Sequence, residues 1–159
     1  MLRAKFTDQK RAPKRVYNKF FRTQKPVYYG DVNVLSEEFS LTKLNKPADW
    51  ANLTVMDKKH TPIIEAPAKV KANEPFAVKI KVGGIDGVEH PNTLSHWINW
   101  VALYAGERLI ARTEFAPELS DKYVVTLNVT LNESTTLRAQ EFCNLHGVWE
   151  GKAKKVVVE

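Results

Sequence analysis

The chain of 159 residues contains very little cysteine, with Cys143 as its only thiol. A single cysteine excludes an intramolecular disulfide framework and is typical of a reducing compartment, so we expect a cytoplasmic protein. No apolar run approaches the ~18 residues that a membrane helix requires. The N-terminal residues 1–21 also lack the apolar stretch of a secretory signal. We therefore expect no membrane partner.

Positive charge is unevenly distributed along the chain. The formal net charge is +6, but residues 1–25 hold nine Lys and Arg against a single acid, so the remainder is slightly negative. A basic arm can contact nucleic acid, anionic lipid or an acidic protein, yet a solvated tail is the commoner outcome. We expect no nucleic-acid partner, and we divide the chain into a basic or mixed N-terminal extension, 1–45, and a domain, 46–159.

The domain has the pattern of an all-β protein. Residues 77–82 alternate apolar and basic side chains, as a half-buried strand does, and 97–105 are apolar and aromatic. Similar runs follow at 108–115, 123–131, 135–143 and 154–158, with turn residues between them. This spacing predicts an antiparallel β-sandwich. In the extension, Ser36 predicts the start of a short helix that ends at Leu44.

The candidate metal ligands all lie in the β domain. They are His60, His90, His96, Cys143 and His146. Cys143 and His146 form a C-x2-H pair, His90 and His96 flank a Pro-Asn-Thr loop, and His60 precedes a Thr-Pro pair. A sandwich presents its sites on such loops. A lone histidine or cysteine is more often structural. When all five lie in loops next to Pro or Gly, a metal site becomes about as well supported as purely structural roles.

The donor set distinguishes the metals. Structural zinc takes four ligands, commonly with several cysteines. Blue copper takes two histidines, one cysteine and a weak methionine, but neither Met1 nor Met56 follows the C-x2-H pair. Iron with four imidazoles and one thiolate uses all five residues and keeps one position open. Two alternatives remain at this point, a cupredoxin-like electron carrier and a β-sandwich interaction module with a relic metal motif.

The ligand segments resemble those of the superoxide reductases, that is, neelaredoxin and the iron-binding domain of desulfoferrodoxin. The family pattern E-K-H-x-P, H-P-x4-H and C-N-x-H-G corresponds to KKHTP (58–62), HPNTLSH (90–96) and CNLHGVW (143–149). The resemblance covers about residues 50–159. Residues 1–45 contain no cysteine, so they are not the four-cysteine iron domain of the two-iron members.

The resemblance implies an immunoglobulin-like, seven-stranded antiparallel sandwich that holds one iron ion per chain. It implies that four equatorial imidazoles come from His60, His90, His96 and His146. It also implies that Cys143 is the axial thiolate. The reaction would be the one-electron reduction of superoxide to hydrogen peroxide, with an external donor such as rubredoxin restoring Fe(II). The family commonly forms dimers or tetramers, so we expect a homo-oligomer.

Two lysines precede the first histidine. Lys59 matches the family lysine that attracts superoxide and stabilises bound peroxide. Lys58 replaces the family glutamate that binds the oxidised iron, and it adds a possible secondary cation. A lysine ammonium does not coordinate Fe(III) at neutral pH. We therefore expect water, hydroxide or Asp57 at the sixth ferric position.

Overall fold

The structure is a computed structural model that describes residues 39–118 and 122–159. The basic residues 1–25 and the start of the helix predicted for 36–44 lie outside the described residues. The described elements are α1 (Val55–His60), β1 (Pro62–Glu65), β2 (Lys69–Val70), β3 (Pro75–Val82), β4 (Ile98–Ala105), β5 (Arg108–Glu114), β6 (Val124–Thr130), β7 (Thr135–Cys143), β8 (Gly147–Glu150) and β9 (Lys154–Val158).

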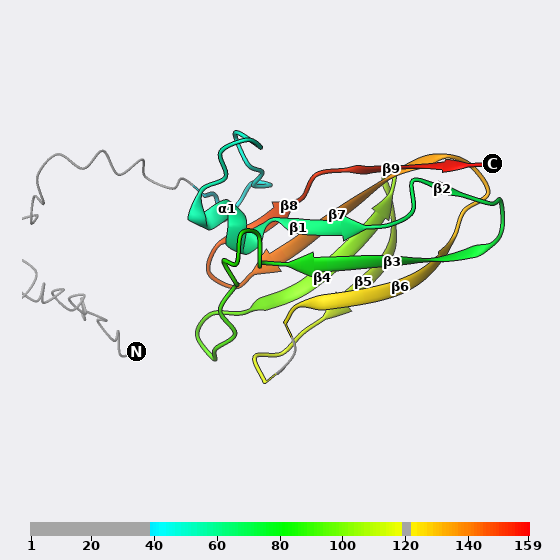
Figure 1. Ribbon diagram of the computed structural model, residues 1–159. Helices are drawn as coiled ribbons and strands as arrows, with labels where there is room; N and C mark the ends of the chain where they lie inside the picture. The colour runs from blue at the N-terminus through cyan, green and yellow to red at the C-terminus, as the bar shows by residue number, and fades with distance from the viewer. Residues whose placement is uncertain (1–38, 119–121) are drawn as a thin grey trace, which may run out of the picture. The chain divides into compact units, whose positions relative to one another are not determined.

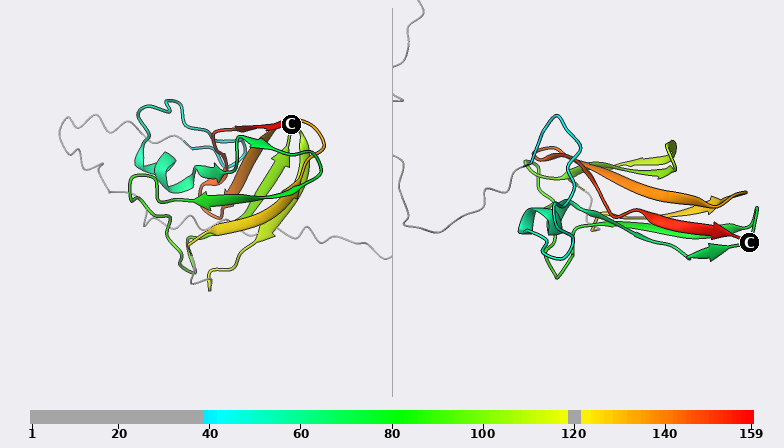
Figure 2. Two further views of the ribbon diagram at one scale, coloured as in Figure 1. Left: turned by 45° about the vertical axis from the view of Figure 1, so that its right-hand side comes forward. Right: turned by 90° about the horizontal axis from the view of Figure 1, so that it is seen from above.

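The strands form two sheets that lie as two layers (Figure 2). The first has the order β1-β3-β6, and the second has the order β2-β9-β7-β4-β5 with β8 also paired to β7. The predicted all-β sandwich is confirmed. The described residues contain nine strands, because β2 and β8 add to the seven expected. The pair β2–β9 is parallel, whereas the other paired strands are antiparallel.

The core lies between the sheets and follows from the alternation of side chains along the strands. On β3 the buried residues are Val78, Ile80 and Val82. On β7 every second residue from Leu137 to Cys143 is buried. Each large apolar side chain removed from water in this way stabilises the fold by about 1.5–3 kcal/mol. The same alternation turns the sulfur of Cys143 inward at the last position of β7.

One end of the sandwich carries α1, the loop from β3 to β4, and the turn from β7 to β8, whereas β9 ends at the opposite end (Figure 1). Helix α1 was not predicted. It begins with a capping box, in which the Thr54 side chain accepts from the Asp57 backbone and the Asp57 carboxylate accepts from the Thr54 backbone. It is the one helix of the described residues and is far too short to cross a membrane.

The helix predicted for 36–44 is wrong over its described part. Residues 39–44 form no helix and the chain bends at 41–43 instead, and Asn45 makes a bridge to Trp149 of β8. The backbone of this segment pairs with a strand that is distant in sequence, and such tertiary pairing outweighs local helix preference.

Candidate metal centre

The structure brings all five sequence-predicted ligands together. They are His60 at the end of α1, His90 and His96 on the β3–β4 loop, Cys143 at the end of β7 and His146 in the β7–β8 turn. One donor atom from each of His60, His90, His96 and Cys143 lies within 4.8 Å of the others. The Nδ1 atom of His146 lies 3.0 Å from Nε2 of His60, 3.1 Å from Nε2 of His96 and 3.4 Å from Sγ of Cys143.

The four imidazoles form a closed ring. In the order His60, His90, His96, His146 and back to His60, successive ring centroids are 4.8, 4.5, 4.7 and 4.7 Å apart. The diagonal from His60 to His96 is longer, at 6.1 Å. Four nearly equal sides and a longer diagonal are consistent with four rings placed at the corners of a square.

In His60 and His90, a hydrogen bond to a backbone carbonyl determines which ring nitrogen faces the site. Nδ1 of His60 lies 2.8 Å from the Met56 carbonyl, and Nδ1 of His90 lies 2.6 Å from the Pro91 carbonyl. A carbonyl oxygen only accepts, so each Nδ1 carries the hydrogen and each Nε2 keeps a lone pair. Nε2 of His90 is buried and has no hydrogen-bond partner among the described residues. A buried lone pair of this kind suits a metal ion.

Burial keeps these imidazoles neutral. It lowers the pKa of His60 to about 3 and that of His90 to about 3. Burial, with His146 and Lys59 nearby, also lowers the pKa of His96. Neutral imidazoles bind a metal ion without first losing a proton.

The thiol and a neighbouring carboxyl are also held neutral by burial. Burial raises the pKa of Cys143 to about 11, although backbone N–H groups of Leu145 and His146 act in the opposite direction. Burial likewise raises the pKa of Glu141, whose side chain faces the core two residues earlier on β7. The thiol therefore loses its proton only when a cation takes its place.

These donors fit iron. Bonds of about 2.1 Å at right angles place neighbouring donors about 3 Å apart, which agrees with the separations of 3.0–3.4 Å around His146 Nδ1. Five donors exceed a tetrahedral zinc set, and imidazole with thiolate suits iron. If all five bound one iron ion, four imidazoles and one sulfur would leave a sixth position for a small molecule.

Two residues that the sequence analysis missed fix the ligand loops. The Tyr123 hydroxyl donates to Asn92 Oδ1 at 2.7 Å and lies 3.2 Å from the Pro91 carbonyl, which also accepts from His90. Asn144 joins the β7–β8 turn to the same β3–β4 loop, because its Nδ2 donates to the Ser95 carbonyl at 2.9 Å and its Oδ1 accepts from the Trp97 backbone at 2.8 Å. The position of Asn144 inside C-N-L-H was a usable signal, whereas nothing in the sequence marked Tyr123.

The three charged residues before His60 lie in different surroundings. Lys58 forms an ion pair with Asp86, at 3.0 Å between Nζ and Oδ2. Lys59 is half-buried, and its charge adds to the effect of burial in lowering the pKa of both His90 and His96. The Asp57 carboxylate accepts from the Thr54 backbone at 2.9 Å and from the Thr54 hydroxyl at 2.8 Å. It does not belong to the donor group around His60 that the described residues form.

The chain is similar to known proteins over the residues that carry this site. The family model described as Desulfoferrodoxin matches residues 52–152. A protein of Methanocaldococcus jannaschii is 42% identical over 110 residues, covering 67% of this chain and 89% of the relative. The superoxide reductase of Pyrococcus furiosus is 30% identical over 124 residues, covering 67% and 92%. The solved superoxide reductase (neelaredoxin) of Ignicoccus hospitalis has a TM-score of 0.61 at 36% identity, covering 73% of this chain and 95% of that chain.

Proposed function

The chain belongs to the desulfoferrodoxin family, and from this premise we propose that it is a superoxide reductase with one iron ion per chain. The observation that carries the proposal is the convergence of four imidazoles and one thiol at one end of the sandwich. Superoxide takes up one electron and two protons to become hydrogen peroxide, and the iron supplies that electron when it is bound. A cupredoxin-like carrier is not favoured, because it would leave two of the four imidazoles unused.

We assign the ligands from the directions of their donor atoms. His60, His90 and His96 would bind through Nε2, whereas His146 would bind through Nδ1. The four rings would form the equatorial square, and Cys143 would be the axial ligand on the core side, where its sulfur is fully buried. His96 and His146 are only half-buried, so the edge of the square that these two rings form is the part of the site nearest to solvent.

Lys59 would attract superoxide to the sixth position of the iron. Lys59 directly precedes the proposed ligand His60, its charge acts with burial to lower the pKa values of His90 and His96, and it has no ion pair within the described part of the chain. A cation at the site raises the encounter rate of an anion and stabilises the anionic product. Lys58 would contribute less, because Asp86 offsets its charge. Water would supply the protons.

The electron comes from outside the chain in this proposal. The sequence has a single cysteine, and the described residues contain one group of possible metal ligands. We propose an external donor such as rubredoxin, which would approach the half-exposed edges of His96 and His146. A homo-oligomer, dimer or tetramer, in the cytoplasm is part of the same proposal.

The decisive test combines metal content with oxygen balance. The full chain is loaded with Fe(II) without air, its metals are counted per chain, and superoxide is supplied with a reductant. We expect about one iron per chain, and peroxide formation without oxygen evolution. Copper in place of iron, oxygen evolution at half the rate of superoxide loss, or no superoxide loss would each contradict the proposal.

A further inference from the structure

We propose that Asn45 is a positioning residue for the iron ligand His146, so that residues 39–46 complete the metal site. These residues lie outside the family-model match at 52–152, and all but Lys46 belong to the N-terminal extension, 1–45, for which the sequence suggested no role. The inference rests on the proposed function, because it takes His146 as a ligand of the iron.

Asn45 is bonded to β8 through its backbone. Its N–H donates to the Val148 carbonyl at 2.9 Å, and its carbonyl accepts from the Glu150 N–H at 3.0 Å. This pairing places Asn45 beside Trp149 in a parallel bridge. The side chain of Asn45 is thereby held over the turn that carries His146.

The side-chain amide of Asn45 then ties three backbone carbonyls together. Its Nδ2 lies 3.3 Å from the His146 carbonyl, 2.9 Å from the Val148 carbonyl and 2.9 Å from the Ser40 carbonyl. Its Oδ1 accepts from the Ser40 N–H at 2.7 Å. One amide thus connects the ligand turn with the preceding segment, and it does so with hydrogens that only an amide supplies at this position.

The close approach depends on Gly147. A Cβ atom at Gly147 would lie 2.7 Å from the Ser40 carbonyl oxygen and 3.2 Å from Cα of Leu41. Gly147 also has a φ of +76°, which side chains other than glycine rarely adopt. The glycine after His146 therefore serves the contact with residues 40–41 as well as the turn itself.

The imidazole of His146 is contacted by the same segment. The Phe39 ring meets it edge-on, with centroids 4.7 Å apart and planes at 87°. Nδ1 of His146 has to point at the metal position, so the ring needs a fixed orientation as well as a fixed backbone. Phe39 contacts the ring, and Asn45 holds the carbonyl of the same residue.

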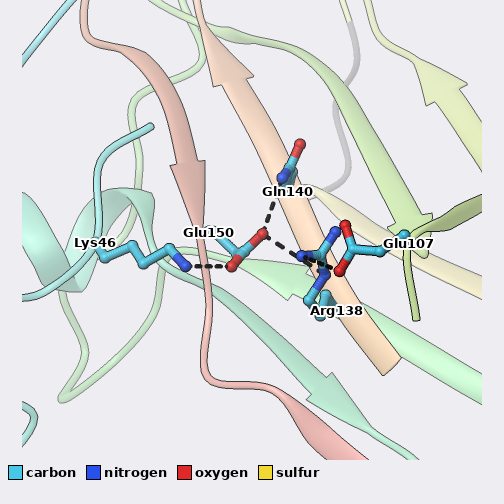
Figure 3. Close-up of polar contacts among 5 residues, drawn as sticks. All are labelled: Lys46, Glu107, Arg138, Gln140 and Glu150. Carbon is cyan, nitrogen blue, oxygen red and sulfur yellow. Dashed lines mark hydrogen bonds and ion pairs between the residues drawn. The ribbon is translucent and has the colours of Figure 1, made fainter. Parts of the chain in front are cut away.

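The far end of the segment is anchored by an ion pair. Lys46 Nζ lies 2.6 Å from Glu150 Oε1, and Gln140 Nε2 donates to Oε2 of the same carboxylate at 2.8 Å. Figure 3 shows Lys46 and Gln140 on either side of the Glu150 carboxylate. The Glu150 side chain is 5% exposed, whereas the Lys46 side chain is 52% exposed, so a buried carboxylate meets a lysine that reaches it from the surface. Residues 39–46 are thus fixed at both ends across the ligand turn.

The experiment compares Asn45→Asp and Asn45→Ala with the wild-type full chain. Asn45→Asp keeps the oxygen that accepts from Ser40 but removes the donated hydrogens. Asn52→Ala is the matched control, because Asn52 is exposed and its side chain donates only to Asp49. The measurements are the rate of Fe(II) loss to excess chelator, the ferric absorption spectrum, the reduction potential of the iron and the thermal midpoint.

We expect both Asn45 variants to lose iron about 10–100-fold faster than wild type, as loss of residues that orient ligands commonly causes. The ferric spectrum and reduction potential should also shift, while Asn52→Ala matches wild type. A lowered thermal midpoint with unchanged iron loss, spectrum and potential would overturn the inference, because it indicates a merely structural role. So would Asn45 variants that match wild type throughout.

Phe39→Ala provides an independent test should Asn45 variants not fold. It removes the ring contact to His146 and leaves the Asn45 amide in place, so we expect a smaller, few-fold acceleration of iron loss. Wild-type rates in Phe39→Ala would count against the inference. Failure of the wild-type chain to bind iron would instead contradict the proposed function, and the two failures are therefore distinguishable.

Discussion

The indole of Trp149 stacks on the imidazole of His60, with ring centroids 5.1 Å apart and planes inclined by 21°. The same indole donates its Nε1–H to the carbonyl of His146 at 3.0 Å. Trp149 is 3% exposed. One buried side chain therefore contacts two proposed ligands that come from α1 and from the β7–β8 turn, 86 residues apart in sequence.

Replacing Trp149 with Phe separates these two contacts. The ring remains available to stack on His60, but the carbonyl of His146 loses a donor, so we expect a loss of stability of about 1–3 kcal/mol and faster release of iron. Urea unfolding and chelator competition measure these effects. Trp100→Phe is the control, because Trp100 stacks on Phe142 of β7, and neither ring belongs to the proposed ligand set. Equal iron release from the two variants would rule out the indole N–H.

Replacing Cys143 with Ser tests the axial assignment. The four imidazoles remain, so we expect the protein still to bind iron, but more weakly, and to lose the visible ferric absorption that a thiolate ligand gives. Superoxide reduction should fall at least 100-fold, since the thiolate tunes the electron density of the iron. Absorption spectra of the oxidised variant decide the point. An unchanged visible band would remove Cys143 from the ligand set.

Replacing Asp57 with Ala tests its role at the oxidised iron. Its carboxylate caps α1 through Thr54, so we expect a loss of stability of about 1 kcal/mol and an unchanged pH titration of the ferric spectrum. Chemical unfolding and a spectral titration give the two numbers. Thr54→Ala removes the other half of the cap and should show the same pair of results. A titration that changes in Asp57→Ala alone would make Asp57 a ligand.

Replacing the two lysines one at a time separates their contributions. We expect Lys59→Ala to slow the reaction with superoxide about 10-fold and to weaken its dependence on ionic strength. Lys58→Ala should have a smaller effect, because Asp86 already offsets that charge. Rapid-mixing kinetics at several salt concentrations provide the comparison. Equal salt dependence in wild type and Lys59→Ala would contradict the assignment.

Glu150 makes stability depend on pH in a predictable direction. Burial acts to raise its pKa, but hydrogen bonds from Lys46 and Gln140 and the charge of Arg138 leave it below the usual 4.5. A lowered folded pKa contributes stability that is present above pH 4.5 and is lost as the pH falls through the folded value. We expect Glu150→Gln to be about 1–2 kcal/mol less stable than wild type at pH 7.

The difference between wild type and Glu150→Gln should shrink below pH 4.5, where the wild-type carboxylate takes up its proton. Urea unfolding at several pH values, on the metal-free proteins, gives the two curves. Glu114→Gln is the control, because its partner Arg112 and its own carboxylate are both exposed. Parallel curves for wild type and Glu150→Gln would show that the carboxylate does not titrate as described.

The long strands were predictable because their pattern is local. The alternation at 77–82 and the apolar run at 97–105 correspond to β3 and β4, since a strand with one buried face repeats every two residues. Short elements were not. Helix α1 has only six residues, and it is held by its capping box and by the buried side chain of His60. The two-residue β2 is a strand only through its pairing with β9, which is distant in sequence.

By itself, the sequence determined the candidate metal donors, because they stand in short motifs that resemble those of a known family. It also determined the fold class, because the alternation of side chains along a strand is a local pattern. The tertiary structure decided that His60 and His90 present Nε2 to the site, since the Nδ1 atoms of these two rings are hydrogen-bonded to the carbonyls of Met56 and Pro91. It also decided that Asp57 caps a helix and that Asn45 lies on the turn of His146. Such contacts join residues up to 101 positions apart, and no local pattern encodes which distant carbonyl a side chain will meet once the sheets have packed.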